Sequence, residues 1–535
     1  ERGAMLRGCA RSVAAAAARG RRACAAEVSG SSPGGAASTG AGSPPGGSSA
    51  RGGGGDRREE RVDGAYVEYA GSTGGGGDTE VDVAVVGGGL VGAALALALS
   101  RQPLSRQLRI AIVDRAPPPP PLPPPRVKSE DGEWPAPSAR VSAVTPSSGR
   151  FLERLGVWGV GAHAPPAAPY EHMQVWDACG GGAVRFHAAD AALPALGAVV
   201  ENGALLAGMH AALREKGLVE NLPPAGVEAI ELPAGSDAGG AVASARAALS
   251  LSDGTCVRAR LVVGADGPTS RVRSLAGINT SDWDYSQKGV VATVRMEGYE
   301  SAARTEDTAW QRFLPTGPLA LLPVSPPGYC NIVWSTTSEH AERLLALSDA
   351  AFADAVNDAL HGEAAVPRGV LPRLLPSGDG ALPPPRAIEA VGRRGAFPLT
   401  MRNAQRYVGR RLALAGDAAH VVHPLAGQGV NLGFADAAAL AACIERGLRA
   451  GLDVGDLVLL REYETERGRA AMAAIAALHG LHTAFGVQSG AAGAVRAAGM
   501  GVINALPPVR RAVVETAAGH GPLSWANADA ISAVM

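Results

Sequence analysis

The sequence has no excess of charge of either sign, since 49 lysine and arginine residues stand against 50 aspartate and glutamate residues. The net charge of −1 gives the chain no general attraction to nucleic acid. Its six cysteines are scattered without a CxxC pair, which argues against a structural zinc site or a disulfide framework and suits a reducing compartment. The one run apolar enough to suggest a membrane span, residues 81–99, carries Asp82 and four glycines. It is better explained as a strand, a turn and a helix.

Glycine and proline are abundant, with 71 and 39 of the 535 residues. Residues Ser29–Gly77 are rich in glycine and serine and cannot bury enough apolar surface to fold. Ahead of them, Met5–Ala26 contains five arginines, many alanines and no acidic residue. This composition is typical of an organellar transit peptide, and a disordered basic tail is the alternative. We therefore expect residues 1–78 to be a transit peptide and a disordered linker.

The first motif is a glycine-rich turn between a strand and a helix. The β-branched run Val81–Val86 leads into Gly87, Gly89 and Gly92, which complete a G-x-G-x-x-G pattern before an Ala/Leu-rich segment. A second predicted strand ends at Asp114. In a βαβ dinucleotide fold, an acid at that position hydrogen-bonds the adenosine ribose. The pattern alone is weak in a glycine-rich chain, but this context predicts a dinucleotide-binding unit.

Two later strands also end in polar turns. Leu261–Val263 leads to Asp266, which could equally cap the next helix. Leu412–Ala415 leads to Gly416 and Asp417, then to the loop Gly427-Gln428-Gly429 and an Ala-rich helical segment. A strand, a turn and a glycine loop that opens a helix present backbone N–H groups to an anionic ligand.

Further strand-like segments fall outside the βαβ pattern, and the chain turns helical from Asp456 onward. The predicted additional strands are Met173–Asp177, Gly289–Met296, Leu319–Val324 and Cys330–Thr336. The fold class that follows is α/β, with a Rossmann-type domain, an inserted antiparallel sheet and a helical C-terminal region. We expect a dinucleotide-binding domain at 79–165, 191–282 and 388–450, a substrate domain at 166–190 and 283–387, and the helical region at 451–535.

The three motifs in this order resemble the class A flavoprotein monooxygenases of the glutathione-reductase-like fold. The stretch Gly416–Gly433, with its Val-Val-His-Pro-Leu-Ala segment, resembles the ubiquinone-biosynthesis hydroxylase branch. Further stretches resemble its mitochondrial C5-ring hydroxylases: Met173–Cys179, Val200–Asn202, Val290–Thr293, Ala309–Pro315, Gly317–Pro323 and Val333–Thr336. The similarity runs from about Val81 to the C-terminus.

The resemblance implies FAD as cofactor. Gly87, Gly89 and Gly92 would let the backbone approach its pyrophosphate, Asp114 would hold the adenosine ribose, and Asp266 would lie beside the cofactor. At the flavin end, the resemblance places Gly416 and Asp417 at the ribityl chain and assigns a cofactor contact to Arg140, which could otherwise be a solvated surface arginine. The loop Gly427-Gln428-Gly429 would aim N–H groups at the N1/O2 edge of the isoalloxazine, where reduction puts negative charge.

The implied activity is hydroxylation at C5 of a polyprenylated 4-hydroxybenzoate or phenol through a flavin C4a-hydroperoxide, with O2 as co-substrate. The implied setting is the matrix face of the mitochondrial inner membrane, as a peripheral protein in a ubiquinone-synthesis complex, with a ferredoxin system as electron donor. Two alternatives stay open: an NADPH-dependent hydroxylase of a soluble phenol, and a non-enzymatic prenyl-binding escort protein of the same fold. No catalytic base can be assigned. We predict no metal site, since His420-x-x-His423 and His479-x-x-His482 each lack a convincing third ligand.

Overall fold

The computed structural model describes residues 78–122, 126–130, 134–233, 246–298, 307–362 and 383–520. All of these belong to one compact unit, Gly74–Met535. The predicted transit peptide and almost all of the predicted linker therefore lie outside the described residues. Within the described ranges, no helix is both long and apolar enough to cross a membrane.

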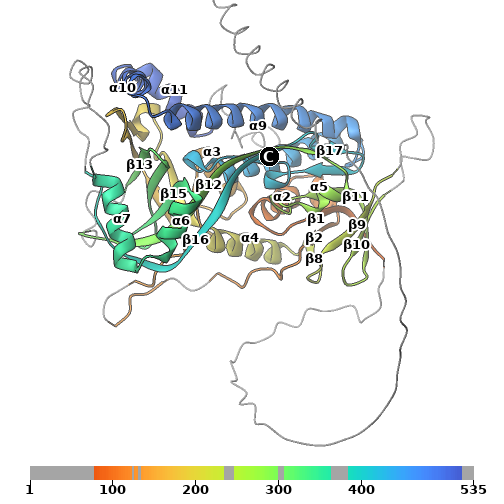
Figure 1. The fold of residues 1–535 in the computed structure, drawn as a ribbon. Coiled ribbons are helices and arrows are strands. Elements are labelled where there is room, and N and C mark those ends of the chain that lie inside the picture. The colour runs from red at the N-terminus through yellow and green to blue at the C-terminus, as the bar shows by residue number, and fades with distance from the viewer. Residues whose placement is uncertain are drawn as a thin grey trace, which may run out of the picture. The chain divides into compact units, whose positions relative to one another are not determined.

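The first sheet is largely parallel and its central strands are mostly buried, and Figure 1 labels most of its strands. Its parallel strands, in spatial order, are β18 (Leu412–Leu414), β11 (Cys256–Gly264), β1 (Thr79–Val86), β2 (Ile110–Val113) and β8 (Val219–Asn221). At its edges lie three antiparallel strands: β17 (Val408–Gly409), β10 (Ala247–Leu251) and β9 (Val227–Glu231). Strand β2 and the carboxyl halves of β1 and β11 consist largely of Val, Ile, Leu and Ala because both faces of a parallel sheet are covered.

Helices α2 (Leu90–Arg101), α4 (Asn202–Lys216) and α8 (Gln428–Arg449) pack together beside this sheet. Helix α2 is buried along almost its whole length and contains five alanines or glycines, which permits close packing on α8. Gly433 illustrates the contact, because a side chain there would collide with Val91 of α2. The two helices therefore start side by side.

The second sheet has eight strands that come from four separate parts of the chain. Their spatial order is β19 (His420–Val421), β16 (Ala387–Ala404), β12 (Thr280–Met296), β15 (Tyr329–Thr337), β14 (Gly317–Pro323), β13 (Thr308–Leu314), β5 (His172–Asp177) and β6 (Ala183–His187). All neighbours are antiparallel except β13 and β5, which are parallel. Helices α6 (Ser338–Ala346) and α7 (Asp349–His361) complete its apolar core.

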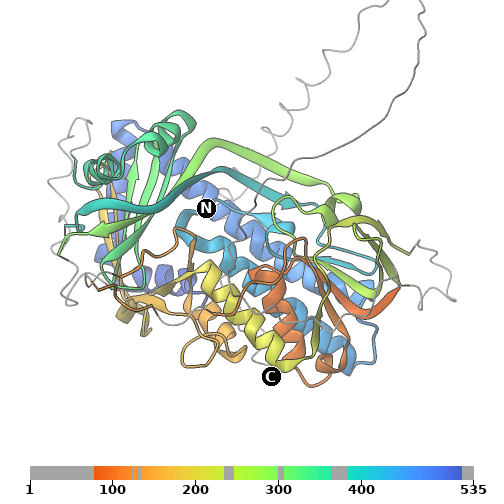
Figure 2. The same ribbon diagram turned by 90° about the horizontal axis from the view of Figure 1, so that it is seen from below.

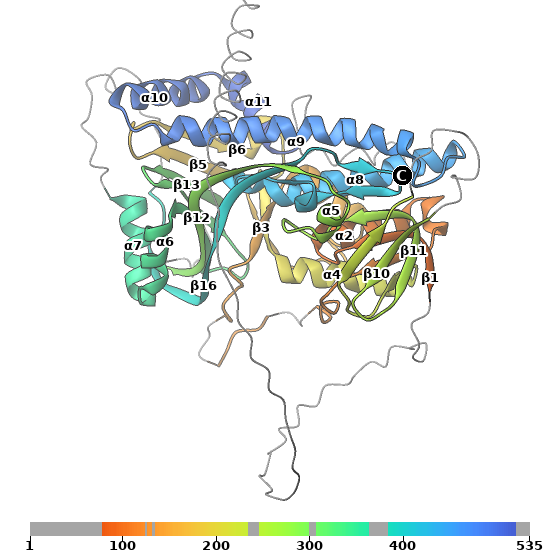
Figure 3. The same ribbon diagram turned by 45° about the vertical axis from the view of Figure 1, so that its right-hand side comes forward.

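Two long strands, β12 and β16, run between the two sheets, as Figure 2 shows. A small third sheet contains β3 (Val141–Val144), β7 (Gly197–Glu201) and β4 (Ala167–Tyr170). Helix α3 (Pro146–Arg154) follows β3, and α5 (Arg271–Leu275) follows β11. At the C-terminal end, α9 (Leu457–Gly486) extends across both sheets, and α10 (Gly490–Ala505) and α11 (Pro507–Ala517) lie near one end of it (Figure 3).

The predicted fold class is confirmed: an α/β protein with a parallel sheet, an inserted and mostly antiparallel sheet, and a helical C-terminal region. All four additional strands are present. The sequence predicted only the apolar second half of β12 and did not predict β16. The proposed boundary at residue 388 falls at the start of β16, which continues to Ala404. The division into two domains stays a proposal.

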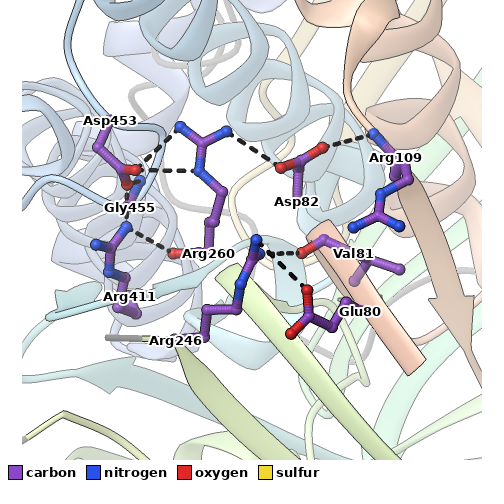
Figure 4. A network of polar contacts seen from close by, with 9 residues as sticks. All are labelled: Glu80, Val81, Asp82, Arg109, Arg246, Arg260, Arg411, Asp453 and Gly455. Carbon is purple, nitrogen blue, oxygen red and sulfur yellow. Dashed lines mark hydrogen bonds and ion pairs between the residues drawn. The ribbon is translucent and has the colours of Figure 1, made fainter. Parts of the chain in front are cut away.

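At the amino ends of the first sheet's strands, an ion-pair network joins β1, β11, the residue before β18 and the segment after α8 (Figure 4). Asp82 accepts from the Arg109 backbone N–H at 2.9 Å and from Arg260 Nη1 at 3.1 Å. Asp453 accepts from Arg260 Nε at 3.0 Å, from the Gly455 N–H at 2.9 Å and from Arg411. This edge is closed by protein contacts, so a ligand site of the sheet has to be sought at its opposite, carboxyl edge.

Replacing Asp453 with asparagine is expected to lower the free energy of unfolding by about 1–2 kcal/mol, somewhat less than the roughly 1.5–3 kcal/mol of a hydrogen bond to a charged group because Asp453 is partly exposed. Burial opposes ionisation of Asp453, but the Gly455 N–H and the two arginines outweigh it and lower its pKa. The effect should therefore be full at neutral pH and vanish only as the pH falls below the ordinary range of an aspartate. Denaturant titration measures it. Asp78→Asn is the control, since its pair with Arg258 is exposed and contributes little; equal losses would contradict a special role for Asp453.

Candidate functional site

Four predicted motif positions meet at the carboxyl edge of the first sheet. The adjacent strands β18, β11, β1 and β2 are parallel, so their carboxyl ends lie together. These ends carry Gly416, Asp266, Gly87 and Asp114, respectively. Ligands of open parallel sheets bind at this edge.

The turn after β1 is built around close backbone approach. Gly87 has φ +105°, a conformation that L side chains rarely adopt, and a side chain there would collide with the Ala265 carbonyl. A side chain at Gly92 would collide with the carbonyl of Gly87, whereas one at Gly89 would meet nothing within 4 Å. The turn is thus closed on its protein side and open at Gly89, where α2 begins.

Asp114 lies directly beside this turn. Its Oδ2 accepts from the Gly88 N–H at 2.6 Å and its Oδ1 from the Ala116 N–H at 2.9 Å. On the other side of the turn, the Nε2–H of buried His210 in α4 donates to the Gly88 carbonyl at 2.8 Å. Burial lowers the pKa of His210, so the imidazole is neutral and holds the turn without adding charge. Sequence reasoning missed His210 because α4 is far from the motif in the chain.

Asp266 is occupied by its own turn. Its Oδ1 accepts from the Ser270 hydroxyl at 2.5 Å, and its Oδ2 from the backbone N–H groups of Arg271 at 2.7 Å and Val272 at 3.1 Å. The carboxylate therefore caps α5, which was the alternative that the sequence left open. Its position next to Gly87 comes from the pairing of β1 with β11.

The turn after β18 leaves Asp417 exposed while its neighbours are buried. The surrounding protein limits hydration of the carboxylate and raises the pKa of Asp417, and nearby Asp436 adds to this effect, although His420 opposes it. Gly416 packs on Val91, at the start of α2. Asp417 therefore lies close to the amino end of α2, with its side chain free of the protein interior.

A buried charge cluster holds the Gly416 turn against α8 and α9. Asp436 of α8 accepts from the Gly416 N–H at 2.9 Å, from His420 Nε2 at 2.6 Å and from Arg467 Nε at 2.7 Å. Its side chain is fully buried. Burial alone would raise the pKa of Asp436, but His420 and Arg467 outweigh burial and lower it. The carboxylate thus stays ionised and ties β18, α8 and α9 together.

The Gly427-Gln428-Gly429 loop opens α8. Gly427 is the N-cap, with φ +61°, and a side chain there would press on Ala143 of β3. Buried Asn431 donates to the carbonyls of Ala143 at 2.8 Å and Gly427 at 2.9 Å, and accepts from the Thr145 N–H at 3.0 Å. It locks the start of α8 to β3. Asn431 was also missed by sequence reasoning, although it lies within the motif.

Arg140 immediately precedes β3 and is exposed. Among the described residues its guanidinium has no protein partner, while its backbone bonds Ser138 and Asn202. Since β3 runs beside the start of α8, the free guanidinium comes from the strand that passes the Gly427 loop.

The two helices that start at this edge lack side-chain caps. Neither α2 nor α8 has a side chain that caps its first N–H groups, and neither has an acid in its first turn. Helices α6 and α7 are capped by Thr337 and Ser348, whereas α4 and α11 share the lack of a side-chain cap. Two uncapped helix starts, packed together through Val91, fit the pyrophosphate and the electron-accepting ring of an extended flavin dinucleotide.

A cavity of about 740 Å³ lies elsewhere, behind the Asp266 turn. Its lining includes Arg273 and Arg402 but none of the predicted cofactor residues. Arg273 donates to the carbonyls of Ala418 and Pro268, and Arg402 to Asp282 and Pro268. These two arginines therefore stabilise the turns after β11 and β18 and are not among the predicted cofactor residues.

The two histidine pairs do not converge on a metal position. His420 is bound to Asp436, whereas His423, three residues later, faces Tyr285 and His482. In the described parts of the chain, no group of three or more His, Cys, Asp or Glu side chains is placed to hold a metal ion.

Comparison with known proteins agrees with this geometry. Residues 383–477 match the family model described as an FAD binding domain. The chain is 35% identical to the mitochondrial ubiquinone biosynthesis monooxygenase COQ6 of Xenopus tropicalis over 82% of this chain and 93% of that protein. It is also 35% identical to the human protein of the same name, over 84% of this chain and 95% of that protein.

Solved structures share the fold. PqsL of Pseudomonas aeruginosa aligns with a TM-score of 0.57 at 23% identity, over 79% of this chain and 99% of that one. The p-nitrophenol 4-monooxygenase PnpA of Pseudomonas putida aligns with a TM-score of 0.58 at 19% identity, over 82% and 97%. At these identities the likeness is one of fold. On the strength of the full-length relatives, the chain belongs to the mitochondrial ubiquinone biosynthesis monooxygenase family and is an FAD-dependent monooxygenase.

Proposed function

We propose that this chain hydroxylates C5 of the aromatic ring of a polyprenylated 4-hydroxybenzoate or phenol in ubiquinone biosynthesis, with O2 as co-substrate. The observation that carries the proposal is the pair of uncapped helix starts, α2 and α8, at one sheet edge. Full-length relatives named for ubiquinone biosynthesis support the pathway.

In this proposal the adenosine end of FAD lies at β1 and β2. Asp114 accepts from ribose hydroxyls with lone pairs left beside its two backbone bonds. The pyrophosphate passes the open position at Gly89, with Gly87 and Gly92 keeping the backbone close. Asp266 acts indirectly by shaping the neighbouring turn.

The flavin end lies at β18, β3 and α8. Asp417, next to Gly416, accepts from the ribityl hydroxyls, and Arg140 reaches the cofactor from the start of β3. The loop Gly427-Gln428-Gly429, whose first N–H already donates to the Pro424 carbonyl at 3.0 Å, places the start of α8 beside the ring edge that gains negative charge on reduction. Bound FAD supplies the activation of O2 and the transfer of one oxygen atom to the ring. The chain's own task is to hold cofactor and phenol together and keep water out.

We further propose a mitochondrial location at the matrix face of the inner membrane, within a ubiquinone-synthesis complex, with electrons from a ferredoxin and its reductase. The Arg-rich N-terminal composition and the relatives named mitochondrial support the compartment. Exposed apolar residues on the C-terminal helices support a peripheral membrane contact. They are Val458, Met472, Leu481, Val495, Val502, Leu506, Val509 and Val513.

A double substitution on α10 tests the membrane contact. Val495 and Val502 lie seven positions apart on one helix face, and both are more than half exposed. Val495→Asp with Val502→Asp is expected to reduce flotation of the protein with anionic vesicles severalfold, since each change replaces apolar surface with a repelled charge. Val160→Asp, at an exposed loop position, is the matched control. Equal flotation of all three proteins would rule out this surface.

Two alternatives make different predictions. A soluble-phenol hydroxylase would oxidise NADPH when a water-soluble phenol is added, without a ferredoxin. The escort-protein alternative is disfavoured by membership in a monooxygenase family.

The decisive experiment is complementation of a ubiquinone-deficient mutant that lacks the C5 hydroxylase, followed by lipid analysis. Restored ubiquinone, with loss of the C5-unmodified intermediate, is the expected result. Persistence of that intermediate with a stably produced, flavin-loaded protein would refute the C5 assignment.

A further inference from the structure

Four ring side chains from three separate elements meet beside the Gly427 loop. Tyr285 comes from β12, His423 from the segment between β19 and α8, and His479 and His482 from α9. The Tyr285 ring centroid lies 4.9 Å from that of His423, 4.6 Å from that of His482 and 6.0 Å from that of His479. His423 and His482 are 5.1 Å apart. We call these residues the ring cluster.

His423 is the buried member, and its tautomer is fixed. It is 1% exposed, and its Nδ1 accepts from the Leu425 N–H at 3.2 Å. Burial and the neighbouring His482 lower the pKa of His423 to about 3, so the ring is neutral. A neutral imidazole whose Nδ1 accepts must carry its hydrogen on Nε2. That Nε2–H has no hydrogen-bond partner, which is costly for a buried donor unless a ligand satisfies it.

Tyr285 is brought into the cluster by irregular backbone. The pairing of β12 with β16 shifts register between Asp284 and Gln287, and Ser286 has φ +54°. Asp284 Oδ1 accepts from the Ser286 N–H at 2.8 Å and holds this conformation. A non-glycine residue in the left-handed region within a bulge is unfavourable, and such bulges re-aim side chains near functional sites.

His482 is also fixed in one tautomer. Gln287 donates its amide Nε2 to the Thr316 carbonyl at 2.8 Å, so its Oε1 faces His482 Nε2, at 3.1 Å, as an acceptor. His482 must therefore donate from Nε2, which leaves its Nδ1 as an acceptor. His482 and Tyr285 therefore contact the His423 ring in fixed orientations, and both are held by strand β12 of the second sheet.

The location of His423 links this donor to the proposed cofactor site. It lies on the segment between Asp417 and Gly427, the two parts of the proposed flavin end. Its neighbours Val422 and Leu425 pack in one apolar cluster with residues of the second sheet and of α9. The segment is therefore shared by the proposed flavin site and the sheet expected to bind the phenol.

We propose that His423 donates its Nε2 hydrogen to a negatively charged oxygen of a ring ligand bound beside the Gly427 loop, and that Tyr285 and His482 position it. The oxygen is either a substrate phenolate or a carbonyl oxygen of reduced flavin, and both have the same acceptor chemistry. No proton is transferred, since neutral His423 acts only as a hydrogen-bond donor. The inference rests on the proposed function because it needs FAD and a phenol at this site.

The test uses the FAD-loaded full-length protein and two readouts other than turnover. The first is the apparent pKa of a bound 4-nitrophenol with an alkyl chain ortho to its hydroxyl, followed by absorbance. The second is the midpoint potential of the bound flavin without phenol. His423→Leu removes the donor, and His423→Gln keeps an amide donor near the position of Nε2. His163→Gln is the control, since the His163 ring pairs with Glu215 of α4 at 2.6 Å and is not part of the ring cluster.

A hydrogen bond to a charged oxygen contributes about tenfold or more. If the acceptor is the phenolate, His423→Leu should raise the probe's apparent pKa by about one unit, with partial recovery in His423→Gln. If the acceptor is the flavin, the same variant should lower the potential by about 30 mV, which is tenfold for a two-electron couple. His163→Gln should change neither readout. Unchanged readouts in His423→Leu with normal FAD content would overturn the inference alone, whereas a wild-type protein that holds no FAD would overturn the proposed function.

Discussion

Replacing Asp417 with alanine is expected to weaken FAD binding by about 10- to 100-fold, so that the protein loses its flavin during purification. The reason is that a carboxylate accepting from ribityl hydroxyls contributes about 1.5–3 kcal/mol. The fold should not change, because the Asp417 side chain is exposed and the buried anchor of its turn is Asp436. Flavin absorbance and far-UV circular dichroism measure the two effects.

The pH dependence of FAD binding adds a second check on Asp417. The pKa of Asp417 is raised, mainly because the surrounding protein limits hydration of its carboxylate. In the proposed site, the ribityl hydroxyls donate to the ionised form of this carboxylate. FAD affinity should therefore fall with decreasing pH earlier than an ordinary aspartate would allow, and Asp417→Asn should lack this step. Asp354→Ala, at an exposed position on α7, controls for loss of a surface charge. Unchanged flavin content in Asp417→Ala would contradict the assigned role.

The second large effect is expected for Asp436→Asn. Removing one partner of a buried ion pair leaves the other charge uncompensated and costs about 3–5 kcal/mol. Here Arg467 loses its counter-charge, and His420 and the Gly416 N–H lose a charged acceptor. We expect a lower denaturant midpoint and, through the loosened Gly416 turn, weaker FAD binding.

The sign of the pH effect follows from the lowered pKa of Asp436. Its contribution to stability should be full at neutral pH and should be lost only as the pH falls below about 4, through the lowered folded-state value. The gap in stability between wild type and Asp436→Asn should shrink over that range. Asp354→Asn, which alters an exposed carboxylate, should leave the midpoint within about 0.5 kcal/mol of wild type. A gap that persists at low pH would show that the lost interaction does not depend on the ionised carboxylate.

Local sequence pattern was sufficient for the carboxyl edge of the first sheet. The run Val81–Val86 followed by Gly87 and Gly89 predicts a strand, a tight turn and a helix start because each step depends on neighbouring residues only. The same holds for Asp114 and for Asp417, which directly follow short apolar strands. Their roles toward FAD stay proposals, while FAD itself follows from the family.

Residues that act across long distances in the chain could not be predicted. His210 and Arg467 support the two turns from helices far away in sequence. The ring cluster joins Tyr285, His423 and His482, which are brought together by the pairing of β12 and the packing of α9. From the sequence, the HxxH spacings could be assessed only as candidate metal sites. A pattern along one segment carries no information about what packs against it.

Strand β16 shows the same limit for the fold. Its centre carries glycines and arginines and lacks the apolar alternation of a half-buried strand. It becomes a strand because β12 offers a long partner edge. Tertiary pairing here outweighs local propensity.

The most direct test of this account is the identity and amount of flavin released from the purified wild-type protein. A site that extends from Asp114 at the adenosine end to Gly429 at the ring end should hold one FAD per chain. We expect one FAD per chain, with FAD rather than FMN in the released fraction. A folded protein that carries no flavin, or that binds FMN equally well, would contradict it.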